Sequence, residues 1–470
     1  MSMQIQILNG IYTDNGPDLR TSYPVNLIPV PKQSGISNGF LRPADGLVAN
    51  GSGPGIDRGG INWQGVCYRV MGTKLITVAS NGAVTELGDV GGPVDSLVTM
   101  DYSFDRLAIA SGGRLYYWDG ATITQVTDPD LGVVLDVAWV DGYFITTDGE
   151  FLVVTELSDP TQVNPLKYGS SEVDPDPVVA LLKLRNEVYA LNRNTIEVFD
   201  NVGGEFFPFQ RIDGAQIQKG VVGTFACCVY MELVAFLGSG RNEAPSIYLG
   251  ANAQAQKIST QEIDEILLGY TETQLASVKL EARNDKSHQH LYVHLPDRTL
   301  VYDAAASDAL GDQVWFTLTT STEGFSQYRA RNIVWAYDKW LVSDPQSSTV
   351  GYMVDTIGEH WGQIVRWEFG TMIVYNDGKG ALFNELELVS LTGRVAVGVD
   401  PKISTSYSLD GQSWSQERYI SVGTNGNTSK RLAWFQQGHM RNWRIQRFSG
   451  NSQAHLSFAR LEARLEGLAY

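Results

Sequence analysis

The sequence predicts an all-β fold built around a β-propeller of six or seven blades. Two features of the composition favour it: the 470 residues include 48 glycines, and 43% of the chain is hydrophobic, with 10% aromatic residues. The third observation is a repeated pattern of short apolar runs separated by turn residues. It is clearest over residues 96–128, which read as SLVTMDYS, DRLAIASG, GRLYYWDG and ATITQVTD. Four-stranded meanders of this length are typical of propeller blades.

The pattern continues through residues 59–361, which we expect to form the propeller. Its copies return at a spacing of about 35 to 45 residues, as in propeller arrays. They share the pattern more than residue identity, and the blade count depends on how the ring closes. The further copies lie at residues 61–89, 134–157, 178–200, 221–260, 280–320 and 331–355.

A small helical insertion is expected at about residues 260–279, between two blades. Ile263, Ile266, Leu267 and Tyr270 recur at helical spacing behind Thr260. Such an element either packs locally or decorates a binding face.

Residues 1–58 are predicted to form an extended N-terminal arm, because six prolines interrupt them and periodic apolar runs are few. The segment TSYPVNLIPVP at residues 21–31 is apolar enough to lie against a surface of its own chain or of a neighbouring subunit. The candidate contact residues in this segment are Tyr23, Pro24, Val25, Asn26 and Leu27.

Residues 362–470 are expected to form a separate, β-sandwich-like domain. The strands there are longer and alternate over eight or more residues, as in ALFNELELVSLTG at 381–393. The last segment, HLSFARLEARLEGLAY, is compatible with either a closing strand or a short terminal helix.

The charge and the cysteines limit the possible partners and compartments. The net charge is −17 with acidic residues scattered along the chain, which disfavours tight wrapping of nucleic acid. Only three cysteines occur, and Cys227 and Cys228 are adjacent, so synthesis in a reducing cytosol is expected. The sequence has neither a signal-peptide pattern at its start nor a long uncharged apolar stretch, so stable membrane insertion is not expected.

Three histidines form the clearest possible metal site. His288, His290 and His294 alternate in SHQHLYVHLP and should share one face of a strand. No carboxylate follows at ligand spacing, and apolar residues occupy the opposite face, which favours a structural role. No metal and no cofactor are therefore assigned.

No catalytic residue is assigned either, and the chain is predicted not to be an enzyme. Two carbohydrate-related alternatives remain open. Carboxylates meeting at a propeller mouth could make a carbohydrate-active enzyme. The hairpin YSLDGQSWS at 407–415 could centre an adhesion module on Asp410 and Trp414, although it equally reads as a plain turn.

Several phrases, in order along about two thirds of the chain, resemble one known family. They include Pro24-Val25-Asn26, Gly39-Phe40-Leu41-Arg42, Thr195-Ile196-Glu197, Gln218-Lys219-Gly220 and Leu300-Val301-Tyr302-Asp303. The chain resembles the tail-hub or nozzle proteins of short-tailed bacteriophages, known as packaged-DNA stabilisation proteins. Beyond about residue 365 the resemblance is only general.

The resemblance implies a structural virion protein of the bacteriophage tail, assembled in the host cytoplasm. It implies a homo-hexamer that makes the head-tail connection beneath the portal adaptor protein, retains packaged DNA and forms the conduit for DNA ejection. Further implied partners are a tail needle or plug and tail spikes or fibres. Double-stranded DNA would pass without sequence-specific binding, since acidic walls repel its backbone.

Overall fold

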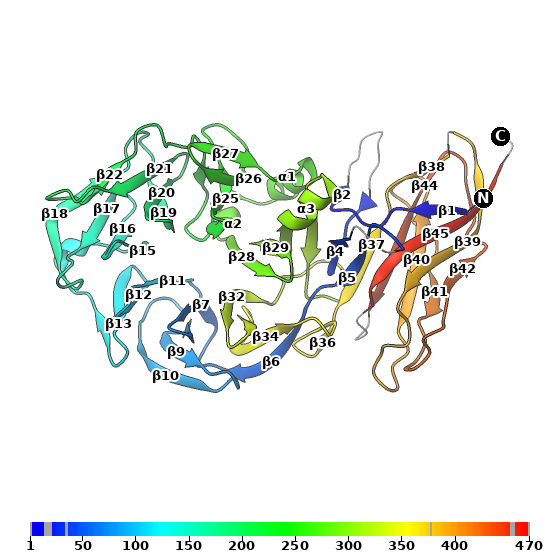
Figure 1. Cartoon of the computed structure of the whole chain (residues 1–470), viewed down its shortest axis with the longest axis horizontal. Coiled ribbons are helices and arrows are strands. Elements are labelled where there is room, and N and C mark those ends of the chain that lie inside the picture. The colour runs from blue at the N-terminus through cyan, green and yellow to red at the C-terminus, as the bar shows by residue number, and fades with distance from the viewer. Residues whose placement is uncertain (1, 14–20, 33–35, 377, 452–455, 469–470) are drawn as a thin grey trace.

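The computed structural model describes residues 2–13, 21–32, 36–376, 378–451 and 456–468. A ring of sheets makes up most of the molecule, and a two-sheet domain lies beside it (Figure 1). Among the described residues, no helix is long and apolar enough to span a membrane. All three cysteines are free.

Seven antiparallel sheets follow one another around the ring, so the propeller has seven blades. The first strands of neighbouring blades contact one another and surround the centre. The blades are β7 (Asp57–Trp63), β8 (Val66–Met71), β9 (Lys74–Val78) and β10 (Val84–Asp89); β11 (Thr99–Tyr102), β12 (Leu107–Ser111), β13 (Arg114–Trp118) and β14 (Ile123–Gln125); β15 (Asp136–Val140), β16 (Tyr143–Thr147), β17 (Phe151–Thr155) and β18 (Val163–Ser170); β19 (Val178–Leu184), β20 (Glu187–Asn192), β21 (Ile196–Asn201) and β22 (Phe209–Arg211); β23 (Gly220–Val221), β24 (Cys227–Tyr230), β25 (Leu233–Ser239), β26 (Ser246–Ala251) and β27 (Gln254–Lys257); β28 (Lys279–Asp285), β29 (His288–His294), β30 (Thr299–Asp303) and β31 (Trp315–Leu318); and β32 (Arg331–Ala336), β33 (Lys339–Ser343) and β34 (Thr349–Val354) with β6 (Gly46–Ser52).

Blade 7 closes the ring by combining the two ends of the propeller sequence. Its fourth strand is β6, which pairs antiparallel with β34 in a register that places Val48 opposite Tyr352. The short strands β35 (Glu359–His360) and β36 (Gln363–Ile364) extend the same sheet beyond β6. This pairing fixes the blade count at seven, within the predicted six or seven.

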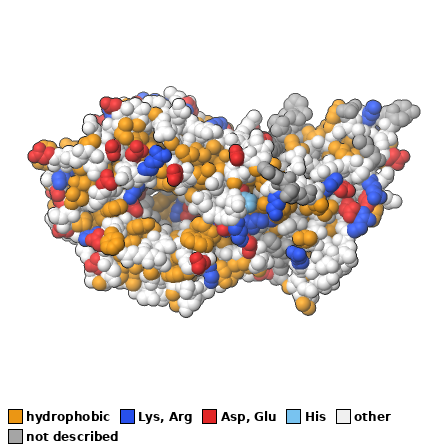
Figure 2. Space-filling model, in the orientation of Figure 1, with side chains coloured by type: hydrophobic (Ala, Val, Ile, Leu, Met, Phe, Trp, Pro, Cys, Tyr) orange, Lys and Arg blue, Asp and Glu red, His pale blue; other side chains and the backbone are white. Residues whose placement is uncertain are grey.

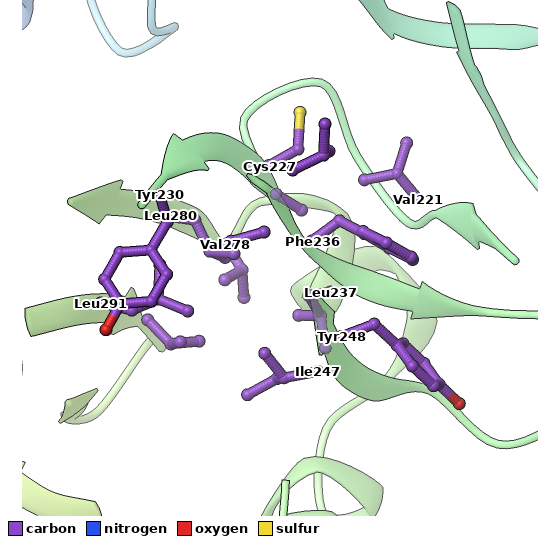
Figure 3. Packing of buried hydrophobic residues seen from close by; sticks show 14 of the residues in the cluster. Val221, Cys227, Tyr230, Phe236, Leu237, Ile247, Tyr248, Val278, Leu280 and Leu291 are labelled. Atoms are coloured by element: carbon purple, nitrogen blue, oxygen red, sulfur yellow. The ribbon is translucent and has the colours of Figure 1, made fainter. Parts of the chain in front are cut away.

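The blades pack face to face through apolar side chains. Figure 3 shows this packing around blades 5 and 6, where Phe236, Leu237 and Ile247 face the same core as Leu280 and Leu291. All five side chains are fully or almost fully buried. Burial of this kind is the main stabilising contribution in such a fold.

In the described parts of the chain, three short α-helices interrupt the β-structure. Helices α1 (Gln261–Leu268) and α2 (Glu272–Ala276) form the insertion between blades 5 and 6, and Ile263 and Leu267 of α1 are buried in the core of these two blades. Helix α3 (Ala304–Leu310) was not predicted; Asp303 caps its start, and Gly311 ends it in the left-handed conformation. A one-turn 3-10 helix, Pro129–Leu131, precedes blade 3.

The C-terminal domain is a β-sandwich. One sheet has the order β4-β5-β45-β39-β42, with β1 on β45 and β43 on β39, and the other has the order β37-β44-β40-β41, with β38 on β44. Between them, the centroid of the Phe369 ring lies 5.2 Å from that of Phe448 and 5.4 Å from that of Phe458. Its strands are β37 (Arg366–Gly370), β38 (Val374–Tyr375), β39 (Ala381–Ser390), β40 (Lys402–Ser408), β41 (Arg418–Ser421), β42 (Leu432–Phe435), β43 (His439–Met440), β44 (Trp443–Asn451) and β45 (Phe458–Gly467).

The prediction that residues 1–58 form an extended arm is wrong for most of the described residues, which form strands of the two domains. Strands β1 (Ser2–Ile5), β4 (Leu27–Pro31) and β5 (Gly39–Pro43) belong to the sandwich, and β6 belongs to the propeller. Strands β2 (Tyr12–Thr13) and β3 (Thr21–Ser22) pair with each other. Figure 1 shows β1 alongside the C-terminal β45, with which it pairs. The described parts of residues 1–58 are therefore built into both domains, because their backbone groups find partners in existing sheets.

Candidate functional site: the central passage and the domain joint

The first strands of the blades surround a narrow central passage. Its cavity has a volume of about 390 Å³ and is lined by residues such as Gly60, Met100, Asp101, Asp136 and Lys183. Figure 2 shows a recess over the middle of the propeller, with acidic and basic side chains interspersed on that face. The free space there equals the volume of on the order of ten liquid water molecules, at about 30 Å³ each. A single propeller therefore leaves no room for a DNA duplex at its centre.

The carboxylates at the passage link neighbouring blades. Asp101 accepts the backbone N–H of Tyr102 at 2.8 Å and that of Trp139, on the next blade, at 2.6 Å. Asp136 likewise accepts Val137 at 2.8 Å and Leu181, again one blade further on, at 2.7 Å. Each carboxylate oxygen of both residues thus accepts one backbone N–H.

Blades 6 and 7 are linked in the same way. Glu281 on β28 accepts the backbone N–H groups of Asn332 at 3.0 Å and Ile333 at 3.1 Å, both on β32.

Burial raises the pKa of Asp136 to about 7 and also raises the pKa of Asp101, although backbone donors oppose both shifts. Perturbed carboxylates in a propeller passage resemble a catalytic site, but here their oxygens hold blades together.

The joint between propeller and sandwich is built on Val25. Its N–H donates to the carbonyl oxygen of Glu368 on β37 at 2.8 Å, and its carbonyl accepts from the Glu368 N–H at 3.1 Å. On the other side, Val25 forms a parallel β-bridge with Thr317 of β31. Val25 thereby makes blade 6 and one sandwich sheet continuous, and it is only 1% exposed.

Asn26 completes this joint with its side chain. Its Nδ2 donates to the carbonyl oxygens of Thr319 at 2.9 Å and Arg366 at 2.7 Å, and its Oδ1 accepts the Thr319 N–H at 3.0 Å. The backbone at Asn26 has a φ of 51°, a left-handed conformation that asparagine tolerates better than most residues. Conformation and hydrogen bonding therefore both favour asparagine here.

The predicted contact residues Tyr23 to Leu27 all lie at this joint. Pro24, Val25, Asn26 and Leu27 are buried within the single chain, and Tyr23 is partly exposed. Burial, together with the nearby Glu368, raises the pKa of the Tyr23 hydroxyl. In this conformation the five residues bind the chain's own two domains, and their contact with another subunit or an adaptor stays a prediction.

The three histidines of β29 do share one face, as predicted. The His288 and His290 rings stack with centroids 5.1 Å apart, and Leu291 and Val293 face the opposite core. No carboxylate follows the histidines at ligand spacing along β29, but the neighbouring strands bring two carboxylates to them. Asp303 from β30 and Glu281 from β28 lie 2.5 Å from His288 and 3.0 Å from His294, respectively.

The hairpin with Asp410 and Trp414 uses its polar groups internally. Asp410 accepts the Ser413 hydroxyl and the backbone N–H groups of Ser413 at 2.7 Å and Gln412 at 2.9 Å, and these hydrogen bonds keep its pKa below the usual range. The guanidinium of Arg447 lies 4.3 Å from the centre of the Trp414 ring. These internal contacts favour the plain turn over a carbohydrate site.

Fold and joint together define a class: a two-domain scaffold in which a seven-bladed propeller is fused through buried backbone pairing to a β-sandwich. The chain belongs to the bacteriophage P22 Gp10 family of tail-hub, packaged-DNA stabilisation proteins. The family's β-propeller model matches residues 3–358, and its β-sandwich model matches residues 366–466.

A curated relative and solved structures add to this comparison. The tail hub protein gp10 of Salmonella phage P22 is 28% identical over 462 residues, covering 93% of this chain and 94% of that protein. Similar solved structures include the Neurospora crassa Pan2 WD40 domain, with 10% identity, a TM-score of 0.42 and coverage of 66% of this chain and 95% of that one. The N-terminal domain of Nup159 has 9% identity, a TM-score of 0.41 and coverage of 71% and 99%.

Proposed function

We propose that this chain forms a homo-hexameric tail hub, or nozzle, that extends the portal-adaptor channel of a phage particle. It retains packaged DNA, provides the conduit for DNA ejection and anchors spikes or fibres. The observation that carries the proposal is the similarity to a tail hub protein along nearly the full length of both chains. Both family domains occur here in the same order.

The dimensions of the propeller support a conduit formed between copies of the chain. Because the passage of one propeller is too narrow for a duplex, DNA must run along surfaces that several copies enclose. Each copy carries a net charge of −17, so the channel walls repel the phosphates of the DNA. The DNA is therefore expected to slide along the walls and not to adhere to them. The physical properties of the chain therefore suit a structural channel protein better than an enzyme.

Electron microscopy of the purified protein with tail-less, DNA-filled capsids tests this proposal. The expected result is a six-fold ring capping the portal vertex, together with protection of the packaged DNA from added nuclease. Capsids that already carry tails are the control and should bind no further protein. Protein that remains monomeric and leaves the DNA nuclease-sensitive would contradict the tail-hub proposal and favour a screen for glycan binding.

A further inference from the structure

A compact group of metal-ligand side chains lies inside blade 6. His288 and His290 on β29 and Asp303 on β30 place one ligand atom each within 4.8 Å of one another, and all three residues are buried. The two strands pair so that His290 lies directly opposite Asp303. The group is therefore positioned by regular strand pairing and does not depend on a loop.

The two oxygens of Asp303 have separate roles. Oδ1 accepts the backbone N–H groups of Gln289 at 3.2 Å, Ala305 at 3.2 Å and Ala306 at 3.3 Å, which fixes the carboxylate. Oδ2 faces the histidines, at 2.5 Å from His288 Nδ1 and 3.5 Å from His290 Nε2. One oxygen is thus held by the backbone, and the other is directed toward both imidazoles.

His290 is the unusual member of the group. It is 1% exposed, and neither ring nitrogen has a hydrogen-bond partner in the part of the chain that the structure describes. An unpaired buried polar group is costly, so a missing partner is expected. His294 on the same face differs: its Nδ1 lies 3.0 Å from Thr299 Oγ1, and its Nε2 lies 3.0 Å from Glu281 Oε2.

The donor atoms of the group suit a cation, because each of the three side chains directs one ligand atom into the same small space. Two imidazole nitrogens and a carboxylate oxygen form a donor set typical of zinc.

An access route leads to the group from the surface. A cavity of about 680 Å³ is lined by Met231, Asp285, His288, Gln289 and Asp308. The His288 side chain is 10% exposed at this cavity, whereas Asp303 is fully buried behind it. An ion can therefore reach His288 from the cavity, and water there can supply a fourth ligand.

We propose that His288, His290 and Asp303 bind one zinc ion, with water as the fourth ligand. Tetrahedral zinc with bonds of about 2.0 to 2.1 Å separates its ligand atoms by roughly 3.3 Å. The distance between His288 Nδ1 and Asp303 Oδ2, 2.5 Å, must then increase by less than about 1 Å. The distance between His290 Nε2 and Asp303 Oδ2, 3.5 Å, already matches a zinc site. The ion would fasten β29 to β30 and to the start of α3, and would supply the missing partner of His290.

Zinc titration of the full-length protein after treatment with a chelator tests the proposal. We expect one tightly held zinc per chain by mass spectrometry of the dialysed protein, and a higher midpoint of thermal unfolding with zinc than without it. Cobalt should replace zinc and give the visible absorption of a tetrahedral site. Native protein that retains no stoichiometric zinc and gives no such cobalt spectrum would overturn the proposal.

Variants assign the ligands. His290→Gln and His288→Gln should each weaken zinc binding by at least about 10- to 100-fold, because even partners of ligands cost that much when lost. The control is His439→Gln, an exposed histidine on β43, which should bind zinc as the native protein does. Circular dichroism checks that each variant is folded. If the His290→Gln variant does not fold, the zinc affinity of His288→Gln, at the edge of the cavity, still tests the assignment. Equal weakening in the control, or full binding by a folded ligand variant, would contradict the assignment.

Discussion

Asn26 shows how a single side chain can join two domains. Asn26→Ala removes three hydrogen bonds and leaves buried groups of Thr319 and Arg366 without their partner. We expect a loss on the order of 3 kcal/mol in the free energy of unfolding. Limited proteolysis should also separate the propeller from the sandwich faster than in the native protein.

Asn252 provides the matched control for this change. It is exposed and has a similar left-handed φ of 49°. Asn252→Ala therefore measures the backbone cost alone, about 1 kcal/mol or less. Equal effects of the two substitutions would mean that the Asn26 side chain does not hold the joint.

The buried Asp136 predicts a pH dependence of stability. Its pKa is near 7 in the folded chain and about 3.9 when unfolded, so between these values the folded state binds more protons. Stability from this group is therefore full below about pH 4 and falls as the pH rises to about 7, by an amount on the order of 4 kcal/mol. Asp136→Asn has no ionisable group at this position and therefore removes this pH dependence of stability.

Urea unfolding of the native protein and of Asp136→Asn at several pH values measures the effect. The stability of the native protein relative to the variant should decrease between about pH 4 and pH 7 and then level off. A difference that stays constant over this range would show that Asp136 ionises normally in the folded chain.

At the scale of elements, the closing pair β6–β34 depends on a close approach of two backbones. A Cβ added at Gly351 would lie 1.9 Å from the carbonyl oxygen of Val48. Gly351→Ala must therefore push β6 away from β34, and we expect a loss of about 1 to 3 kcal/mol in stability. Thermal unfolding and hydrogen exchange of β6 measure this loss.

Gly467, near the end of β45, is the control for this substitution. A Cβ at Gly467 meets nothing within 4 Å among the described residues, and its φ lies outside the left-handed range. Gly467→Ala should change stability by less than about 0.5 kcal/mol. If Gly351→Ala were equally harmless, the ring closure would tolerate a wider spacing than the structure has.

For the whole molecule, charge predicts its behaviour toward DNA. With 52 acidic and 35 basic residues, the chain should not retard duplex DNA in gels at about 0.15 M salt and roughly 10 μM protein. The reason is that non-specific binding requires clustered cations that release counterions. Retardation that weakens steeply with added salt would reveal a basic surface and contradict a repelling channel.

The β-class, most individual strands, the helical insertion and the shared histidine face could be predicted from the sequence alone. These features are local: alternation of apolar residues and turn chemistry act between residues close in the chain. The family was also identified from phrases such as Pro24-Val25-Asn26. Helix α3 was missed, although Asp303 before an alanine run and Gly311 after it were available as signals.

The pairing of strands that are far apart in the sequence could not be predicted and became visible in the folded chain. It closed the ring with β6, placed β1, β4 and β5 in the sandwich, and fixed Val25 between Thr317 and Glu368. It also brought Asp303 to His288 and His290. The physical reason is that a strand's own pattern specifies which face is buried, while its hydrogen-bonding edges accept many partners. The choice among them depends on packing of the whole chain.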